Sequence, residues 1–413
     1  MAMSTTACSS DTTDPLSPLP DNDTKETKDN EYKSITLTRA EEKLVNGNND
    51  FAFNVFRKTV LEVYDGNKSV VMSPLSITYA LGMLNNGAAG ETRKQICEVL
   101  GFADTEVDSI NSFCHKMLTE SPTLDKLTKV LIANTIFMNS KYEINTQFKQ
   151  LAHDYYDAEP ETRDFKDGKT LDVINQWASD HTENMIQKVL SDDEFKVNAA
   201  SYLLNAIYFK GAWAEKFNKN STMNGTFHTP TGDTQVPMMH QTNDFGYTET
   251  NDCQILKLPY GNSAYSMTII LPQEGKTIDH VLASLNSKSW QQNRWMRTCE
   301  VDVKLPRFET KADINLKMVM SILGMPRAFD SYLAEFPNFC NIPTYIEMMK
   351  QVARIKLDEE GTEAAAVTAI GMMETTAVAP PRRVEFHATR PFLYVISEES
   401  TGTVFFIGQY MGD

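Results

Sequence analysis

The sequence predicts an α+β fold, with helices in the first part of the chain and strands in the later part. Phe53, Phe56 and Val60 recur at spacings of three and four residues, the repeat of one helix face. Residues 202–209 form an almost unbroken apolar run, as in a strand buried on both faces. Because the two patterns are segregated rather than alternating, they favour a mixed α+β domain over a parallel-sheet enzyme.

The same two repeats predict the other elements. Ser73 followed by Pro74 is typical of a helix start, since serine caps the first turn and proline fits the first helical position. Val301, Val303 and Leu305 alternate with charged residues, which indicates a strand with one wet face. Tyr64 continues the helix face of Phe53, Phe56 and Val60. Two other helix faces are expected, one with Ile77, Leu81 and Leu84 and one with Ile174, Trp177, His181 and Met185. Residues 266–271, 392–396 and 403–408 are expected strands.

The bulk composition excludes several classes of function. The chain has 413 residues and a formal net charge of −16. Proteins that bind nucleic acid or anionic membranes need clustered Lys and Arg, so neither partner is expected. The length alone suggests two or three domains, although no linker of Gly/Ser or Pro and no repeat follows residue 41.

No arrangement of residues indicates a metal centre, a cofactor site or a catalytic site. The seven histidines and six cysteines lack the HExxH and CxxC spacings of metal ligands, and no glycine-rich phosphate loop is present. Residues 261–265 resemble the turn that carries a catalytic serine, but Tyr265 replaces the required glycine, so a plain turn between strands is expected. Most of the cysteines are expected to be small core residues; they are Cys8, Cys97, Cys114, Cys253, Cys299 and Cys340.

Residues 1–41 are expected to form a disordered tail, because Ser, Thr, Asp, Pro and Asn dominate from Ser4 to Asn30. The small residues before Cys8 look like the end of a bacterial lipoprotein signal, in which the cysteine receives lipid. The apolar stretch of such a signal is not in the sequence, so the chain would begin just inside it. Two interpretations stand side by side: a lipid anchor on Cys8, or a cysteine without a role. The first implies a bacterial protein that is secreted or lipid-anchored at the cell surface.

Residues 359–381 do not fit an ordinary helix or strand. The alanines from Ala364 to Ala366 suit a short helix, but the β-branched residues that follow and the closing Pro380-Pro381 do not. Long irregular segments inside compact domains are uncommon and usually functional. We therefore expect this segment to carry the function.

Several blocks of sequence occur in the order of one known family, from about residue 45 to residue 413. They are SPLSI at 73–77, GAAGET at 87–92, NAIYFKGAW at 205–213, KLPRF at 304–308, EEGTEAAA at 359–366, RPF at 390–392 and FFIG at 405–408. Together they resemble the serpin family of serine protease inhibitors. The resemblance implies one domain at 42–413, with three β-sheets, eight or nine helices and an exposed reactive-centre loop at about 359–381.

The resemblance further implies a suicide-substrate inhibitor that has no catalytic residue of its own. A target protease attacks the loop and forms an acyl-enzyme, which is trapped when the cleaved loop inserts into the central sheet. The sequence suits insertion, because Thr362, Ala364, Ala366 and Thr368 are small and share one face of an extended strand, with Glu363 on the other face. The implied hinge residues are Gly361, Thr362, Glu363, Ala364, Ala365, Ala366, Val367 and Thr368.

The family's usual spacing after Gly361 places the cleaved bond at Thr375–Thr376. Counting back from the C-terminal blocks gives a position nearer Ala377, because this loop is about two residues longer; further candidates are Met372, Met373 and Glu374. No Lys or Arg occurs there, which favours an elastase-like or subtilisin-like target over a trypsin-like one. Glu374 as bait would suit a glutamate-specific protease.

The resemblance implies two further groups of residues. The polar residues Ser73, Ser76, Asn205 and Gln351 would control loop entry beneath the sheet, and Glu359, Arg307 and Trp213 would meet at its top. Relatives usually have a histidine where Gln351 stands. Because glutamine carries no titratable charge, loop opening is expected to be insensitive to mildly acidic pH. Ser69 replaces an asparagine that the family pattern predicts.

Two other classes of function remain open. A carrier or chaperone with the same fold would have bulky or charged residues in the hinge, where this chain has small ones. An enzyme would need a site that no motif reveals. For the inhibitor we expect a monomer without a cofactor, whose partners are serine proteases, with cysteine proteases as a further class.

Overall fold

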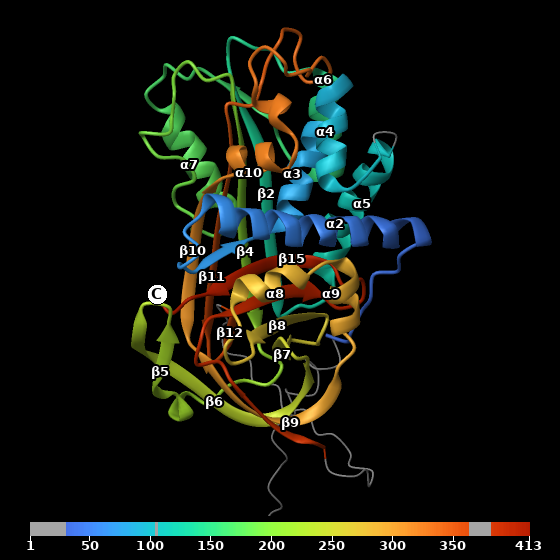
Figure 1. Cartoon of the computed structure of the whole chain (residues 1–413). Coiled ribbons are helices and arrows are strands. Elements are labelled where there is room, and N and C mark those ends of the chain that lie inside the picture. The colour runs from blue at the N-terminus through green and yellow to red at the C-terminus, as the bar shows by residue number, and fades with distance from the viewer. Residues whose placement is uncertain (1–29, 104–105, 363–380) are drawn as a thin grey trace, which may run out of the picture.

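The computed structural model describes residues 30–103, 106–362 and 381–413 (Figure 1). Nine α-helices lie in this part of the chain: α2 Arg39–Lys58, α3 Pro74–Gly87, α4 Gly90–Leu100, α5 Val107–Glu120, α6 Thr146–Tyr156, α7 Thr170–His181, α8 Ile278–Ser284, α9 Ser287–Asn293 and α10 Leu316–Leu323. A short π-helical segment, η1 Thr59–Val63, continues α2. Three 3₁₀ turns complete the helical elements: η2 Ser121–Thr123, η3 Lys219–Ser221 and η4 Pro326–Phe329.

The strands of the described residues are β1 Val70–Met72, β2 Thr128–Asn139, β3 Glu161–Arg163, β4 Ser201–Ala212, β5 Met223–Thr229, β6 Gly232–Glu249, β7 Cys253–Tyr260, β8 Tyr265–Pro272, β9 Arg297–Pro306, β10 Phe308–Asn315, β11 Met348–Asp358, β12 Gly361–Thr362, β13 Arg383–His387, β14 Phe392–Glu398 and β15 Val404–Tyr410. The predicted strands and the predicted turn at 261–265, which lies between β7 and β8, are confirmed. The predicted helix start at Ser73 is also confirmed, because its side chain accepts a hydrogen bond from the backbone N–H of Ser76.

Two details of the sequence analysis are corrected. Met185 was expected on the same helix face as Ile174, but α7 ends at His181, since Glu183 and Asn184 adopt positive φ angles of 51° and 64°. The folded chain also begins before residue 42, where the domain was expected to start. Ile35 is buried, and Thr38 caps α2. The boundary was placed too late because it relied on the average polar composition of residues 1–41, which two such residues do not change.

The six-stranded sheet has the strand order β10-β11-β12-β4-β2-β3. Its central strands β4 and β11 run parallel and pair directly over residues 202–208 and 348–354. At their C-terminal ends the two-residue strand β12 lies between them and is antiparallel to both. The boundary between β4 and β11, called the seam below, is thus closed along most of its length and occupied by β12 at one end.

The nine-stranded sheet has the order β1-β15-β14-β8-β7-β6-β9-β13, with β5 paired to β6. The long strand β6 pairs with β9 over most of its length and with β7 only at residues 246–249. It therefore joins two of the three expected sheets into one hydrogen-bonded network. Figure 1 shows β6 and β9 curving around the lower end of the molecule.

The main core lies between the two sheets and the helices. α3 is buried along almost its whole length and contacts β2 and β4 of one sheet and β15 of the other. A second, smaller core forms where α7 and the segment after it pack on the opposite face of the six-stranded sheet. Both faces of β4 are buried as a result, as its apolar run predicts.

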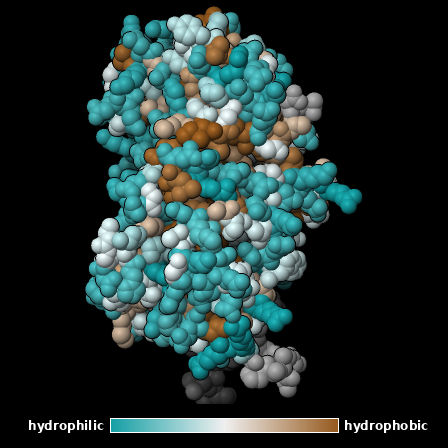
Figure 2. All heavy atoms as spheres, in the orientation of Figure 1, coloured by the Kyte–Doolittle hydropathy of each residue, from teal (hydrophilic) through white to brown (hydrophobic). Residues whose placement is uncertain are grey.

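The face drawn in Figure 2 is mostly hydrophilic, with apolar side chains gathered over α10 and the adjoining end of α2. Exposed apolar residues on these contacting elements include Leu61 of η1 and Met318 and Ile322 of α10. Within the described residues, no helix combines the length and the apolar character that a membrane span requires.

Candidate functional site at the β4/β11 seam

The described part of the expected loop ends inside the six-stranded sheet. Gly361 pairs with Asp358 of β11 and Ala212 of β4, and Thr362 pairs with Leu357 and Gly211. Thr362 is fully buried, and its hydroxyl lies 2.7 Å from the Tyr260 hydroxyl. The first two hinge residues therefore already occupy a strand position in the seam.

Glycine is required at position 361 because of the close backbone approach. The residue has a φ of +146°, and a Cβ atom there would lie 2.1 Å from the carbonyl oxygen of Gly211. Any side chain would push β12 away from β4. The glycine of the hinge signature thus has a direct structural reason in this chain.

Backbone hydrogen bonds hold the turn between β11 and β12 from one side. The Trp213 indole Nε1 donates to the carbonyl of Asp358 at 3.0 Å, and the Trp213 backbone N–H donates to the carbonyl of Glu360 at 2.9 Å. Phe217 donates its backbone N–H to the carbonyl of Glu359 at 3.0 Å. The Trp213 ring stacks on Tyr260 at a centroid distance of 4.5 Å, which connects the turn to the residue beneath Thr362.

The carboxylate of Glu359 is buried at this turn, with 3% of its side chain exposed. It accepts a hydrogen bond from the Thr222 hydroxyl at 2.7 Å and lies 3.5 Å from Nη1 of Arg307. Burial pushes the pKa of Glu359 upward, but the hydrogen bonds and the charge of Arg307 outweigh it, so the pKa is lowered. Glu359 and Arg307 thus lie side by side, and Trp213 binds the backbone on both sides of Glu359.

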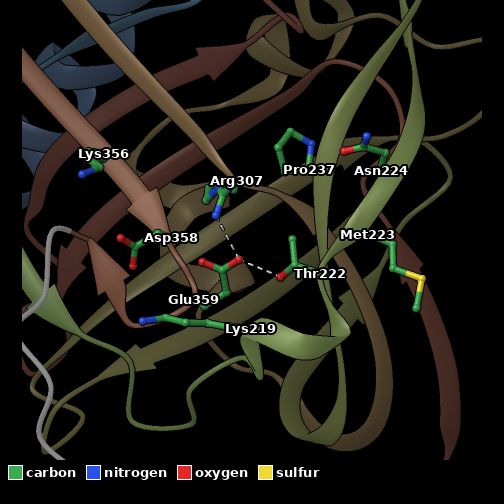
Figure 3. Close-up of a pocket in the computed structure, with 9 residues that line it drawn as sticks. All are labelled: Lys219, Thr222, Met223, Asn224, Pro237, Arg307, Lys356, Asp358 and Glu359. Carbon is green, nitrogen blue, oxygen red and sulfur yellow. Dashed lines mark hydrogen bonds and ion pairs between the residues drawn. The ribbon is translucent and has the colours of Figure 1, made fainter.

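Glu360 extends these contacts toward solvent. Its two carboxylate oxygens each lie 3.0 Å from a lysine Nζ, one from Lys216 and one from Lys219. These contacts lower the pKa of Glu360. A hollow of about 500 Å³ opens beside the turn, with Glu359 and Thr222 in its wall (Figure 3). It is lined by Lys219, Thr222, Met223, Asn224, Pro237, Arg307, Lys356, Asp358 and Glu359.

A second polar group lies deeper, beneath the directly paired part of the seam. Gln351 of β11 donates to Asn205 Oδ1 of β4 at 2.5 Å and exchanges two 3.0 Å hydrogen bonds with the backbone of Ser73. Asn205 donates in turn to Ser76 and, at 2.6 Å, to Asn134 of β2. All five residues are buried. The four residues expected here are thus brought into one network, and none of its side chains is acidic or basic.

Sequence reasoning missed several contacts of this site. Asn134 lies opposite Asn205 in the β2/β4 register, and its only sequence signal is a polar residue inside an apolar strand. Thr222, Lys216 and Lys219 come from the segment after β4 and carry no pattern that links them to the hinge. Tyr260, beneath Thr362, lies in a separate block of the chain.

Much of the expected loop lies outside the described residues. This holds for the hinge positions Glu363, Ala364, Ala365, Ala366, Val367 and Thr368, and for the reactive-bond candidates Met372, Met373, Glu374, Thr375, Thr376 and Ala377; Cys8 lies outside as well. After the gap the chain re-enters the nine-stranded sheet as edge strand β13, parallel to β9. The loop therefore links the seam of one sheet to the edge of the other.

The remaining expected chemistry concerns metals and cysteines. Across 30–103, 106–362 and 381–413, no group of three or more His, Cys, Asp or Glu side chains is placed to hold a metal ion. The five cysteines in these ranges are buried, as expected of core residues. Burial raises the pKa of the Cys114 thiol well above its usual range.

Comparison with known proteins identifies the class to which this fold belongs. The family model "Serpin (serine protease inhibitor)" matches residues 46–412, which is most of the chain. The chain therefore belongs to the serpin family, and both the predicted resemblance and the predicted fold class are confirmed. Sequence and structure agree, since the matched span contains the seam, the hinge and both sheets.

Particular relatives support the same assignment. An uncharacterised serpin-like protein of Thermococcus kodakarensis is 31% identical over 384 residues, covering 92% of this chain and 88% of that protein. The native-state structure of the thermophilic serpin tengpin superposes with a TM-score of 0.82 at 27% identity, covering 93% of this chain and 97% of that one. The structure of human thyroxine-binding globulin complexed with thyroxine superposes with a TM-score of 0.80 at 28% identity, covering 89% of this chain and 98% of that one.

Proposed function

We propose that this serpin is a suicide-substrate inhibitor of proteases, which traps the acyl-enzyme by inserting its cleaved loop into the seam between β4 and β11. The observation that carries the proposal is the position of Gly361 and Thr362, which already form a strand between the two. Because the loop begins inside the seam, insertion of the cleaved loop would only extend the strand that Gly361 and Thr362 begin.

The strand register predicts which β4–β11 residue pairs continued insertion of the loop would replace. Thr362 lies opposite Leu357 and Gly211, so each further residue of an antiparallel strand falls one position lower on both neighbours. Residue 365 would lie between Arg354 and Tyr208, and residue 371 between Met348 and Tyr202. Residues 365–371 would thus take the place of the seven direct β4–β11 pairs. The same register follows from either neighbour.

The side chains suit this register. Thr362 points into the core, so Ala364, Ala366 and Thr368 would point the same way, and all are small. Thr368 would fall level with both Gln351 and Asn205. Insertion would separate that pair, and the Thr368 hydroxyl would supply a replacement partner in the space between them.

The energy available from insertion is large. About a dozen new strand hydrogen bonds, at a net of ~0.5–1.5 kcal/mol each, amount to roughly 6–18 kcal/mol. A whole domain is usually stable by only about 5–15 kcal/mol. The uninserted state would therefore be metastable and kept by a kinetic barrier.

In the proposed reaction, the protease nucleophile attacks the carbonyl carbon of Thr375, and the amino group of Thr376 leaves. The acyl-enzyme ester would normally be hydrolysed, but insertion of the loop moves and distorts the protease first. The bait sequence without Lys or Arg supports an elastase-like or subtilisin-like target. We also propose that the protein acts outside the cytoplasm, secreted or lipid-anchored at the cell surface, as a lipid on Cys8 would imply.

The test is incubation with subtilisin or elastase, followed by denaturing electrophoresis and mass spectrometry. We expect a covalent complex and a released C-terminal peptide that begins at Thr376. Thr362→Arg places a charged side chain on the inward face, so it should abolish the complex while the loop is still cut. Glu363→Arg, one residue further on the outward face, should keep it.

One combined result would argue against inhibition. If these proteases cut the loop without forming a complex, and the melting temperature of the cut protein is unchanged, a carrier is favoured. Thyroxine-binding globulin illustrates that a protein of this fold can be a ligand binder. Equal loss of the complex in both hinge variants would instead remove the assigned register of insertion.

A further inference from the structure

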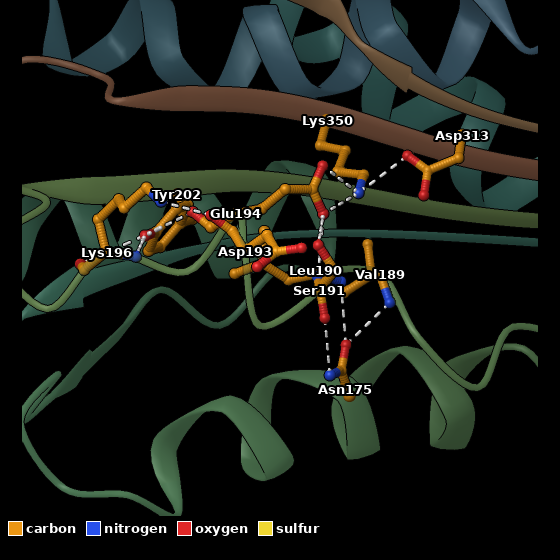
Figure 4. Close-up of polar contacts among 10 residues, drawn as sticks. All are labelled: Asn175, Val189, Leu190, Ser191, Asp193, Glu194, Lys196, Tyr202, Asp313 and Lys350. Carbon is orange, nitrogen blue, oxygen red and sulfur yellow. Dashed lines mark hydrogen bonds and ion pairs between the residues drawn. The ribbon is translucent and has the colours of Figure 1, made fainter.

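A charge cluster with a buried lysine at its centre crosses the seam on the face opposite the polar network. Lys350 of β11 has only 2% of its side chain exposed, and its Nζ contacts both carboxylate oxygens of Glu194, at 2.6 and 2.7 Å. The same Nζ lies 2.9 Å from the carboxylate of Asp313 on β10 (Figure 4). One lysine thus ties its own strand to a neighbouring strand and to the segment between α7 and β4.

That segment, residues 182–200, is attached mainly to the β4 side of the seam. Asn175 of α7 accepts hydrogen bonds from the backbone N–H groups of Val189 and Leu190 and donates to the Leu190 carbonyl. The Tyr202 hydroxyl of β4 accepts from the backbone N–H of Lys196 at 2.5 Å. Figure 4 shows the segment lying between α7 and the sheet. It therefore moves with α7 and β4 rather than with β11.

Contacts from this segment to β11 must change when a strand enters the seam. Neighbouring strands are about 4.8 Å apart, so one inserted strand moves β11 from β4 by about that distance. β10 pairs with β11 along its whole length and would move with it, which preserves the contact between Lys350 and Asp313. The contact between Lys350 and Glu194 spans the seam and cannot be preserved unless the segment shifts.

Breaking this contact costs free energy because the lysine is desolvated. A buried ion pair that loses one partner leaves its charge poorly compensated. The Glu194 carboxylate is also held in place by the backbone N–H of Ser191 at 2.9 Å and by its hydroxyl at 2.8 Å. Burial acts to raise the pKa of Glu194, but the hydrogen bonds from Lys350 and Ser191 outweigh it and the pKa is lowered.

We propose that Lys350 and Glu194 form a clamp that holds the seam closed and sets the rate at which the loop inserts. This rests on the proposed function for its consequence, since insertion is the step it slows. The clamp lies on the outward face, whereas Gln351 and Asn205 join the same strands on the inward face. Asp313 serves as the partner that Lys350 keeps once the clamp opens.

The clamp has two opposite effects on an inhibitor. A weaker clamp lets the uncleaved protein convert sooner to an inactive, inserted form. It also lets the cleaved loop insert sooner, so more acyl-enzyme is trapped before water releases the protease. A substitution that merely destabilises the fold has no reason to raise the trapped fraction.

The test compares Glu194→Gln with Asp193→Asn, which removes the same charge from the adjacent, exposed position. In Glu194→Gln we expect the amide hydrogens at 202–208 and 348–354 to exchange roughly tenfold faster or more. We also expect a similar acceleration of heat-stable conversion and a larger fraction of complex with subtilisin. Asp193→Asn should match the wild type in all three.

The outcomes separate the clamp from the proposed function. If Glu194→Gln and Asp193→Asn exchange alike, the clamp does not exist, even if the wild type forms covalent complexes. If the wild type forms none, the inhibitor proposal fails, and the exchange rates still decide whether the pair closes the seam. In a Lys350→Met background, Glu194→Gln should add nothing; an additive effect would mean that Glu194 acts elsewhere and would overturn the clamp.

Discussion

The seam between β4 and β11 is closed in two different ways along its length. At the loop end, the turn carries ionised side chains, with Glu359 beside Arg307 and Glu360 beside two lysines. In the middle, Gln351 and Asn205 join the strands through uncharged amides. In the first region the Glu360 pairs lie near solvent and the Glu359 carboxylate is buried, whereas the whole second region is buried beneath the sheet.

This difference separates what starts insertion from what lets it proceed. Exposed ion pairs contribute little each and respond to salt and pH. A buried hydrogen-bonded group costs its full desolvation when a partner is lost, and this cost does not depend on pH when neither partner titrates. Insertion should therefore begin under electrostatic control at the loop end. Further along, the amide network on the inward face adds a barrier that is independent of charge, while the Lys350–Glu194 clamp acts on the outward face.

Glu359→Lys should give the largest effect. It places a cation beside Arg307 at a position that is 3% exposed and removes the acceptor of the Thr222 hydroxyl. An uncompensated buried charge of this kind costs about 3–5 kcal/mol. The turn should open and the native monomer should convert to inserted or polymeric forms, as measured by size-exclusion chromatography after mild heating.

A charge reversal elsewhere on the same sheet is the control for that experiment. Glu309 pairs with Arg354 on an exposed part of β10, with 44% of its side chain accessible. Glu309→Lys should leave the monomer intact. If Glu359→Lys is equally stable, the buried carboxylate does not hold the loop end of the seam.

Gln351→Leu should have the next largest effect, at the middle of the seam. It leaves the backbone N–H of Ser73 and the side-chain oxygen Oδ1 of Asn205 without a partner. Orphaned buried groups cost roughly 1–3 kcal/mol each, so the apparent stability of the native monomer should fall by at least about 2 kcal/mol. The midpoint of urea unfolding measures this; an unchanged midpoint would mean that the network contributes nothing.

Gln351→His tests the expected insensitivity to mild acid. Burial among uncharged groups would lower the pKa of a histidine there below its unfolded value near 6.5. Stability would then be lost as the pH falls below that value, because the unfolded chain takes up the proton. The wild type should keep a flat insertion rate between pH 5 and 7 while the variant does not. A steep wild-type profile would contradict the expectation.

Sequence patterns were sufficient for the fold because the strands that build the seam have strong signals. The apolar run at 202–209 and the hinge blocks around Gly361 each reflect local constraints, such as burial on two faces or a missing Cβ. The end of α7 was misplaced because left-handed backbone at Glu183 and Asn184 ends it without glycine or proline.

Contacts across the seam were less accessible to sequence reasoning, since they depend on register. Asn134 joins the network only because it lies opposite Asn205 in the sheet. Lys350 looks like an ordinary outward residue, and it is buried only because residues 182–200 fold over it. The family resemblance supplied Ser73, Ser76, Asn205 and Gln351, but not these partners.

The smallest expected effect concerns the partly exposed ion pairs of Glu360. Lys216 and Lys219 lower its pKa, so their contribution is present above the unfolded carboxyl value near 4.3 and is lost as the pH falls through the lower folded value. Conversion of the wild type to the heat-stable form should therefore quicken between about pH 5 and 3. Glu360→Gln should show a flatter profile and, at pH 7, convert roughly two- to fivefold faster.

Lys219→Ala should change the rate still less, because Lys216 keeps its contact with the other carboxylate oxygen of Glu360. An acid response that survives in both Glu360→Gln and Glu194→Gln, the two other seam carboxylates whose pKa is lowered, would assign the titration to Glu359, whose pKa is also lowered and whose carboxylate is buried. The loop end of the seam would then depend on the buried carboxylate of Glu359 rather than on the partly exposed ion pairs of Glu360. In that case the two regions would differ in charge but not in burial.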